Sequence, residues 1–234
     1  MNWSPLWISL QIALPATIIT FLLGTFIAWK VYQSDKSRSS LWDVMLTLPL
    51  VLPPTVAGFL LLLLFGRNGL LGKPLLYMGI QVVFTKTAAV IAAVVISFPL
   101  MYRSSLAAFE QVDSNLVQAG RTLGMSEWKI FRRVILPLAL PGVISGGILS
   151  FARALGEFGA TLMIAGNITG VTQTMPLAIY MNLQGGKLRE TTGWVVILVL
   201  FSFGMIFTMN YLSLRKMKWE RDKDESIRQN KKTV

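Results

Sequence analysis

The sequence predicts an all-α fold, a polytopic bundle of about five membrane-spanning helices, and three observations lead to this prediction. Hydrophobic residues make up 53% of the 234 residues and charged residues only 14%, whereas a soluble domain carries about 25% charged residues. Several stretches lack charge over the roughly 20 residues that a helix needs to cross a bilayer. No amphipathic or charged element remains that could cover so many apolar helices in water. The composition therefore favours a membrane protein over a soluble enzyme.

Five stretches are apolar and long enough to span the membrane, and we expect the spans at 6–30, 43–65, 79–102, 134–157 and 191–214. The first stretch is too long, and its start too poor in Lys and Arg, for a cleavable signal peptide. The second contains Leu52-Pro53-Pro54-Thr55, which predicts a kink or a break that neighbouring helices can accommodate. The third is interrupted by Lys86, which we expect to reach toward the outer interface.

The distribution of Lys and Arg predicts the orientation of these spans. Three basic residues lie at or just after the end of the first span, five lie in the segment 103–133 and eight in the tail 215–234, whereas the alternate loops hold four. Five spans put the three basic segments on one face, which the positive-inside rule makes cytoplasmic. We therefore expect a multi-pass protein of the cytoplasmic membrane, in contact with lipid, with its N-terminus outside and its C-terminus inside. The net charge of +11 reflects this asymmetry, and we expect no nucleic-acid partner.

Two segments are assigned outside the five spans. The stretch 158–186 lacks charge, but a sixth span there would place the basic tail opposite the basic segment 103–133. We therefore expect a re-entrant or interfacial piece with a short helix over 176–182. The tail, 215–234, is expected to be a solvated cytoplasmic end, and contact with anionic lipid is the alternative.

The segment 103–133 is expected to form two short helices on the cytoplasmic side. Asp113 can cap a helix from Ser114 to about Leu123, and Gly124 permits the left-handed turn that ends it. Ser126 can cap the second helix. The first helix should carry an apolar face with spacing i, i+3, i+4 and i+7: Leu116, Ala119, Gly120 and Leu123. The pattern alone leaves open whether this knob docks a cytosolic partner or lies flat on the membrane.

One pair of opposite charges is expected within a span. Arg153 and Glu157 are four residues apart and would share a helix face. Charges inside a membrane tend to face the bundle interior or a watery cavity, so the pair is a candidate element of a pathway or gate. The alternative is a structural ion pair that fixes helix packing. Glu157 nearly cancels the charge of Arg153.

The sequence offers no catalytic centre. It contains neither Cys nor His, which excludes disulfides, thiolate chemistry, Cys/His zinc sites and His-dependent acid–base catalysis. The glycine-rich run 66–73 is not a P-loop, because Arg67 and Pro74 occupy the positions that need Gly and Ser or Thr. We therefore expect that this chain is not an enzyme.

The cytoplasmic segment resembles a known motif. Val117-Gln118-Ala119-Gly120-Arg121-Thr122-Leu123-Gly124, followed by Val134-Ile135-Leu136-Pro137, resembles the EAA loop of bacterial ABC importer permeases. That pattern is Glu-Ala-Ala, three residues, Gly, nine residues, Ile, any residue, Leu-Pro. The spacing fits throughout, and the departures are Gln118 for the Glu, Gly120 for the second Ala and Val134 for the Ile. The lost carboxylate affects any salt bridge made from that position but leaves the helix-turn-helix intact.

Longer stretches are similar to the permease subunit of molybdate ABC transporters, and the likeness covers about 5–214. They are Leu136 to Gly142, Phe151 to Thr161, Ala165-Gly166-Asn167 and Thr172 to Tyr180. Sulfate permeases are similar but usually longer. The resemblance implies a subunit that translocates molybdate, driven by two separate ATPase subunits and supplied by an extracellular or periplasmic oxyanion-binding protein. ATP and Mg would bind to the ATPase, so no cofactor is expected in this chain.

In this family the EAA loop inserts into a cleft of the ATPase as a coupling helix. The resemblance therefore implies that the contact with the ATPase is carried by Leu116, Val117, Gln118, Ala119, Gly120, Arg121, Leu123, Gly124 and Trp128. A bundle of five helices is too small to enclose a pathway with two gates, so we expect a two-fold homodimer.

Other functions remain open on the sequence alone. Within the same class, tungstate, sulfate or thiosulfate could replace molybdate. An ion-driven secondary transporter would need acidic or His relay residues at the midplane, and Glu157 alone supports it thinly. A membrane scaffold that recruits a cytosolic protein through 103–133 is the third class.

Overall fold

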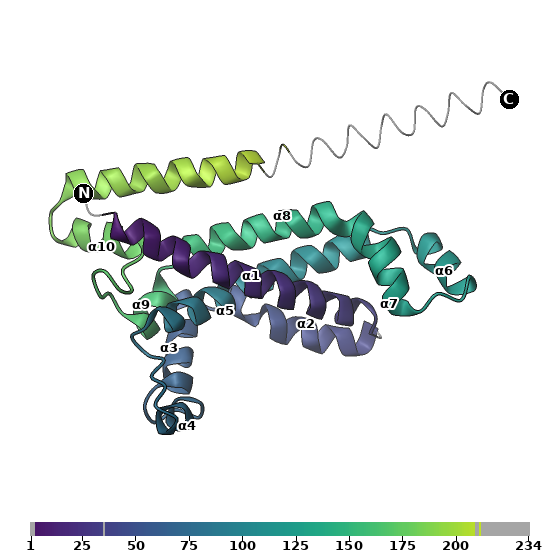
Figure 1. Ribbon diagram of the computed structural model, residues 1–234, viewed down its shortest axis with the longest axis horizontal. Coiled ribbons are helices and arrows are strands. Elements are labelled where there is room, and N and C mark those ends of the chain that lie inside the picture. The colour runs from purple at the N-terminus through teal and green to yellow at the C-terminus, as the bar shows by residue number, and fades with distance from the viewer. Residues whose placement is uncertain (1–2, 35, 209–210, 212–234) are drawn as a thin grey trace.

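The described part of the chain in the computed structural model covers residues 3–34, 36–208 and 211, and it contains helices and connections but no strand. The expected tail 215–234 and the end of the expected span 191–214 lie outside the described residues. The helices in order are α1 Ser4–Tyr32, α2 Lys36–Val51, α3 Pro54–Phe65, α4 Gly72–Tyr77, α5 Lys86–Glu110, α6 Ser114–Thr122, α7 Glu127–Ile130, a π-helical turn Phe131–Ile135, α8 Leu136–Leu155, α9 Gly159–Ala165 and α10 Met175–Gln184. A final helix, without a label in Figure 1, runs over Leu188–Thr208.

Four of the described helices are long and apolar enough to cross a membrane. They are Ser4–Tyr32, Lys86–Glu110, Leu188–Thr208 and the continuous helix Glu127–Leu155 that α7, the π-helical turn and α8 form together. The stretch 158–186 holds only the short helices α9 and α10. The short helix expected over 176–182 is therefore present, as α10.

The second expected span, 43–65, is not one helix. Leu41–Val51 and Pro54–Phe65 are two helices, and the chain bends by 108° between them. Pro53 takes an extended conformation, with φ −53° and ψ 134°, because the ring of Pro54 excludes the helical region for the residue before it. The two prolines therefore produce a sharp corner, where we expected a kink or a break within one span.

Two other helix ends differ from the expected spans. The third expected span, 79–102, is a helix that begins at Lys86 and runs to Glu110, so the first part of the segment 103–133 is a helical extension of the span. Thr85 caps its start by accepting a hydrogen bond from the amide of Ala88. Lys86 donates to Gln11 Oε1 of α1 at 2.8 Å. The fourth helix ends at Leu155 rather than at 157.

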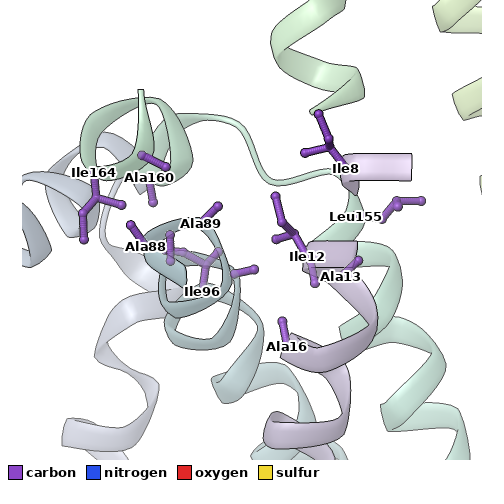
Figure 2. Close-up of a cluster of buried hydrophobic side chains, with 14 of the residues drawn as sticks. Ile8, Ile12, Ala13, Ala16, Ala88, Ala89, Ile96, Leu155, Ala160 and Ile164 are labelled. Atoms are coloured by element: carbon purple, nitrogen blue, oxygen red, sulfur yellow. The ribbon is translucent and has the colours of Figure 1, made fainter. Parts of the chain in front are cut away.

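α5 lies at the centre of the bundle and packs against α1, α8, α2 and α9. Figure 2 shows why the helices can approach closely: alanines of α1 and α5 alternate with a few isoleucines in one buried cluster. Small residues at helix contacts bring backbones together, which drives association where lipid removes the hydrophobic effect. The same principle holds at Gly58 of α3, where an added Cβ would lie 2.6 Å from the Cα of Ala160 in α9.

Figure 1 places α6 and α7 at one end of the long axis and α9 and α10 at the other, with α3 and α4 projecting to the side. A second buried cluster, rich in aromatic rings, fills the end that carries α6 and α7. Its members come from α1, α5, α6, α7, the π-helical turn and α8, and they include Trp29, Phe109, Ile130 and Phe131. The connecting segment around α6 is thus anchored on the bundle and does not hang free.

Candidate functional site

The helix α6 has the two ends that the sequence predicts. Asp113 Oδ1 accepts a hydrogen bond from the amide of Asn115 at 2.9 Å, which satisfies one of the free amides of the first turn. At the other end Gly124 has φ +71°. The amide of Met125 donates to the carbonyl of Gly120 at 3.1 Å and that of Gly124 to Arg121 at 2.9 Å, which together form a Schellman motif. Both predictions are confirmed.

The faces of α6 differ in part from the expectation. Leu116 and Leu123 are exposed, with 47% and 79% of their surface accessible, and Ala119 is exposed beside them. Gly120, which we expected on the same face, is buried together with Val117. An added Cβ at Gly120 would lie 3.1 Å from Ile130 Cγ1. The close approach that this glycine permits is therefore to α7 of its own chain, and the exposed stripe consists of Leu116, Ala119 and Leu123.

The second expected helix is short and is not a separate element. Ser126 Oγ accepts from the amide of Lys129 at 3.4 Å, as the sequence predicts. α7 then passes through the π-helical turn directly into α8. α7 and α8 therefore belong to one continuous helix, Glu127–Leu155, that is long and apolar enough to cross a membrane.

Aromatic rings join α7 to the end of α1. The ring centroids of Trp29 and Phe131 are 4.6 Å apart, and those of Trp29 and Trp128 are 5.2 Å apart. Phe109 of α5 meets Phe131 edge-on at 5.6 Å. Trp128 keeps 56% of its surface exposed, so it both contacts the bundle and presents a ring to the outside. Aromatic pairs at these distances contribute about 0.5–1.5 kcal/mol each beyond the area they bury.

An ion pair that the sequence analysis missed crosses the turn between α6 and α7. Arg121 Nε donates to Glu127 Oε1 at 2.8 Å, and Arg121 Nη2 donates to Glu127 Oε2 at 3.2 Å. Gln33, just past the end of α1, donates to Glu127 Oε2 at 3.5 Å. The hydrogen bond from Arg121 lowers the pKa of the Glu127 carboxyl, and the same bond raises the pKa of the guanidinium. Gln118, in the place of the family's Glu, is exposed.

A signal for this pair was present in the sequence. Glu127 directly follows the cap residue Ser126, and acidic residues favour the first turn of a helix. Its partner could not be inferred, because the left-handed turn at Gly124 sets which side chains of α6 and α7 meet.

The candidate pair of Arg153 and Glu157 is brought together, although not on one helix. Arg153 Nη1 lies 2.7 Å from Glu157 Oε2. α8 ends at Leu155, so Glu157 lies in the connection to α9, and its Oε1 accepts from the amide of Ala160 at 2.8 Å. Glu157 is 2% exposed, and the Arg153 side chain is 32% exposed. The carboxylate therefore joins the end of α8 to the start of α9, with both its oxygens satisfied.

The profile of the family described as binding-protein-dependent transport system inner membrane component matches residues 20–216. The chain belongs to this family. The family is one of multi-span inner membrane proteins, so this membrane component is a transport subunit of the inner membrane.

Two relatives bear the same name. The chain is 45% identical over 189 residues to the molybdenum transport system permease protein ModB of Escherichia coli strain K12, covering 80% of this chain and 82% of the relative. It is 40% identical over 220 residues to ModB of Haemophilus influenzae, covering 93% and 96%. The resemblance to molybdate permeases is thereby confirmed along nearly the whole chain.

Solved structures confirm the fold. A bacterial ABC transporter involved in the import of the acidic polysaccharide alginate matches with a TM-score of 0.75 and 14% identity, over 91% of this chain and 78% of that chain. The MetNI methionine ABC transporter, in an inward-facing conformation, matches with a TM-score of 0.72 and 17% identity, over 91% and 95%. The membrane component therefore has the fold of ABC importer permeases, and the ion-driven and scaffold interpretations are not favoured.

Proposed function

We propose that this chain is the permease subunit that carries molybdate across the cytoplasmic membrane in an ATP-driven importer. The observation that carries the proposal is α6, a capped helix that exposes an apolar stripe at one end of the bundle. After the Gly124 turn it is followed by α7, which continues without a break into a membrane-crossing helix. The sequence identity of the chain to relatives named molybdenum transport system permease proteins supports molybdate over tungstate or sulfate as the substrate.

The stripe of α6 is suited to a cleft on a separate ATPase. Leu116, Ala119 and Leu123 would make the contact, with Trp128 beside them, while Val117 and Gly120 hold the loop together from within. Gln118 and Arg121 lie on the exposed surface and would frame the contact. Closure of two ATPases around ATP and Mg would then displace α6 and, through α7, the helix α8. ATP hydrolysis belongs to the partner chain.

The orientation follows from charge. The end that carries α6 also carries Arg103, Lys129, Arg132 and Arg133, and the positive-inside rule makes it cytoplasmic. The N-terminus is then outside, and α9 and α10 lie toward the outer side, where an oxyanion-binding protein delivers its load. A two-fold homodimer completes the pathway, since one small bundle does not enclose two gates.

The Arg153–Glu157 pair serves first as a structural joint between α8 and α9. Its charges cancel at 2.7 Å, and the Glu157 carboxylate also caps α9. A gating role would require this joint to open during transport. The charge-neutral variant Glu157→Gln tests it: a joint gives loss of the folded complex, whereas a gate gives a folded complex with altered uptake.

The function is tested by the ATPase activity of the complex, purified through a tag on this chain and reconstituted in liposomes. Binding protein is added after loading with molybdate, tungstate or sulfate, one at a time. Stimulation by the molybdate-loaded form is expected. Stimulation by another anion alone would reassign the substrate, and absence of any co-purifying ATPase would refute the coupling role of α6.

A further inference from the structure

The carboxylate that Arg121 binds lies on α7 and not on α6. The EAA pattern has Glu at the position of Gln118, and no residue of α6, Ser114–Thr122, is acidic. Arg121 of α6 nevertheless binds a carboxylate in two hydrogen bonds, at 2.8 and 3.2 Å. That carboxylate belongs to Glu127, in the first turn of α7 on the far side of the Gly124 turn.

Glu127 contacts three elements at once. One oxygen receives Arg121 Nε from α6, and the other receives both Arg121 Nη2 and Gln33 Nε2 from the end of α1. The residue itself is on α7, which continues into α8. A single carboxylate thus links α6, the end of α1 and the membrane-crossing helix Glu127–Leu155.

The buried side of α6 is narrow. Val117 and Gly120 are its buried residues: Val117 belongs to the aromatic cluster, and an added Cβ at Gly120 would meet Ile130 and Met125. Two contacts in one line allow the helix to rock, whereas a guanidinium bound to a carboxylate by two parallel hydrogen bonds fixes an orientation as well as a distance. An exposed ion pair adds little to global stability, so its effect should appear in geometry rather than in folding.

We propose that Glu127 is a positioning residue that holds the coupling helix at a fixed angle to α7 and ties it through Gln33 to α1. A push on α6 then moves α1 and α8 together. This inference rests on the proposed function, because it assigns the part of the loop that makes ATPase movement productive. In this chain the carboxylate bound to Arg121 comes from α7, and Gln118 of α6 carries none.

The test compares variants of the full chain in the reconstituted complex. Glu127→Gln removes the charge and keeps the shape, and Lys129→Gln removes a charge from the same helix as the matched control. The quantity measured is molybdate taken up per ATP hydrolysed, with ATPase co-purification recorded separately. Glu127→Gln is expected to lower uptake per ATP by about 1.4- to fivefold, the range that corresponds to one exposed ion pair, while the complex still assembles. Gln33→Met should lower it less, and Lys129→Gln should leave it unchanged.

A charge swap tests the pairing itself. The double variant R121E/E127R can form the same ion pair with the two charges exchanged. The α6 amides of the purified double variant should therefore exchange hydrogen at the wild-type rate. The proposed role of Glu127 is overturned if the α6 amides of the double variant are less protected from exchange than those of the wild type. It is also overturned if Glu127→Gln and Lys129→Gln give equal uptake per ATP. Either result leaves the proposed function standing if the wild-type complex couples uptake to ATP. If the wild-type chain recruits no ATPase, the proposed function fails instead.

Discussion

Replacement of Gly124 by Ala tests whether the turn after α6 is needed for coupling. Gly124 has φ +71°, and an added Cβ would meet nothing within 4 Å. The cost is therefore that of the backbone alone, about 1–2 kcal/mol for an L-residue in the left-handed region. That cost changes the ratio of formed to frayed turns by about 5- to 30-fold. Asn tolerates this conformation better than Ala, so Gly124→Asn should lose less.

The assay is uptake of molybdate per ATP in the reconstituted complex, together with hydrogen exchange of α6. The chain supplies a matched control in Gly186, with φ +72° and equally open surroundings. It ends α10 in the same motif, in which the amide of Lys187 donates to the carbonyl of Asn182 at 2.9 Å. Gly186→Ala therefore carries the same strain at the opposite end of the molecule.

We expect Gly124→Ala to accelerate exchange in α6 and to lower uptake per ATP, with Gly124→Asn in between. Gly186→Ala should leave exchange in α6 unchanged. The reasoning is refuted if Gly124→Ala speeds exchange in α6 and transport per ATP stays at the wild-type value. Equal effects of Gly124→Ala and Gly186→Ala on exchange in α6 would show that the strain is not local.

Three further predictions follow from the packing and the charges. Gly120→Val places branched atoms against Ile130, whose Cγ1 lies 3.1 Å from the position of an added Cβ. This overpacking costs about 1–3 kcal/mol and should lower uptake per ATP, whereas Gly120→Ala should be tolerated after a small shift of Ile130. Gly58→Ala puts a Cβ 2.6 Å from the Cα of Ala160, and because backbone must move, it should lower the thermal unfolding midpoint of the complex while Gly204→Ala, in open space, does not. Because Arg121 lowers the pKa of Glu127, the ion pair contributes to stability at every pH above the ordinary Glu pKa of about 4.3 and is lost as the pH falls through the lowered pKa. Infrared titration of the Glu127 carboxylate, with Glu127→Gln as the reference that lacks it, measures this pKa. A pKa at or above about 4.3 would contradict the prediction.

The ends of α6 could be predicted from the sequence, and its orientation could not. Asp113 and Gly124 act on the backbone next to them, so each gives a local signal. Which side of a helix faces its own chain depends on what lies there. Apolar residues of α6 occupy both sides, and spacing alone put Gly120 with the exposed Leu116 and Leu123. The structure turns Gly120 toward Ile130, a residue ten positions further along the chain.

The spans show a related limit. Hydropathy reports where a helix lies in lipid, and it does not report where the helix ends. A helix can leave the membrane without unwinding. The helix of the third expected span, α5, continues past Arg103 to Glu110. In the fourth, Gly156 ends the helix, so Glu157 reaches Arg153 from a connection and not from the same face. The pairing was predicted, and its geometry depended on a helix end that apolar composition does not mark.

These differences bear on how movement would pass through the molecule. We expected two short helices between the third and fourth spans. The structure instead extends α5 out of the bundle on one side of the loop and continues α7 into α8 on the other. Within residues 86–155, only the segment between Glu110 and Glu127 departs from long helices, and it contains α6, the Gly124 turn and Arg121 of the Arg121–Glu127 pair. Under the proposed function, a short helix held by an ion pair between two continuous helices would convert a small push into a displacement of whole spans, since packed helices shift between discrete arrangements and do not deform continuously.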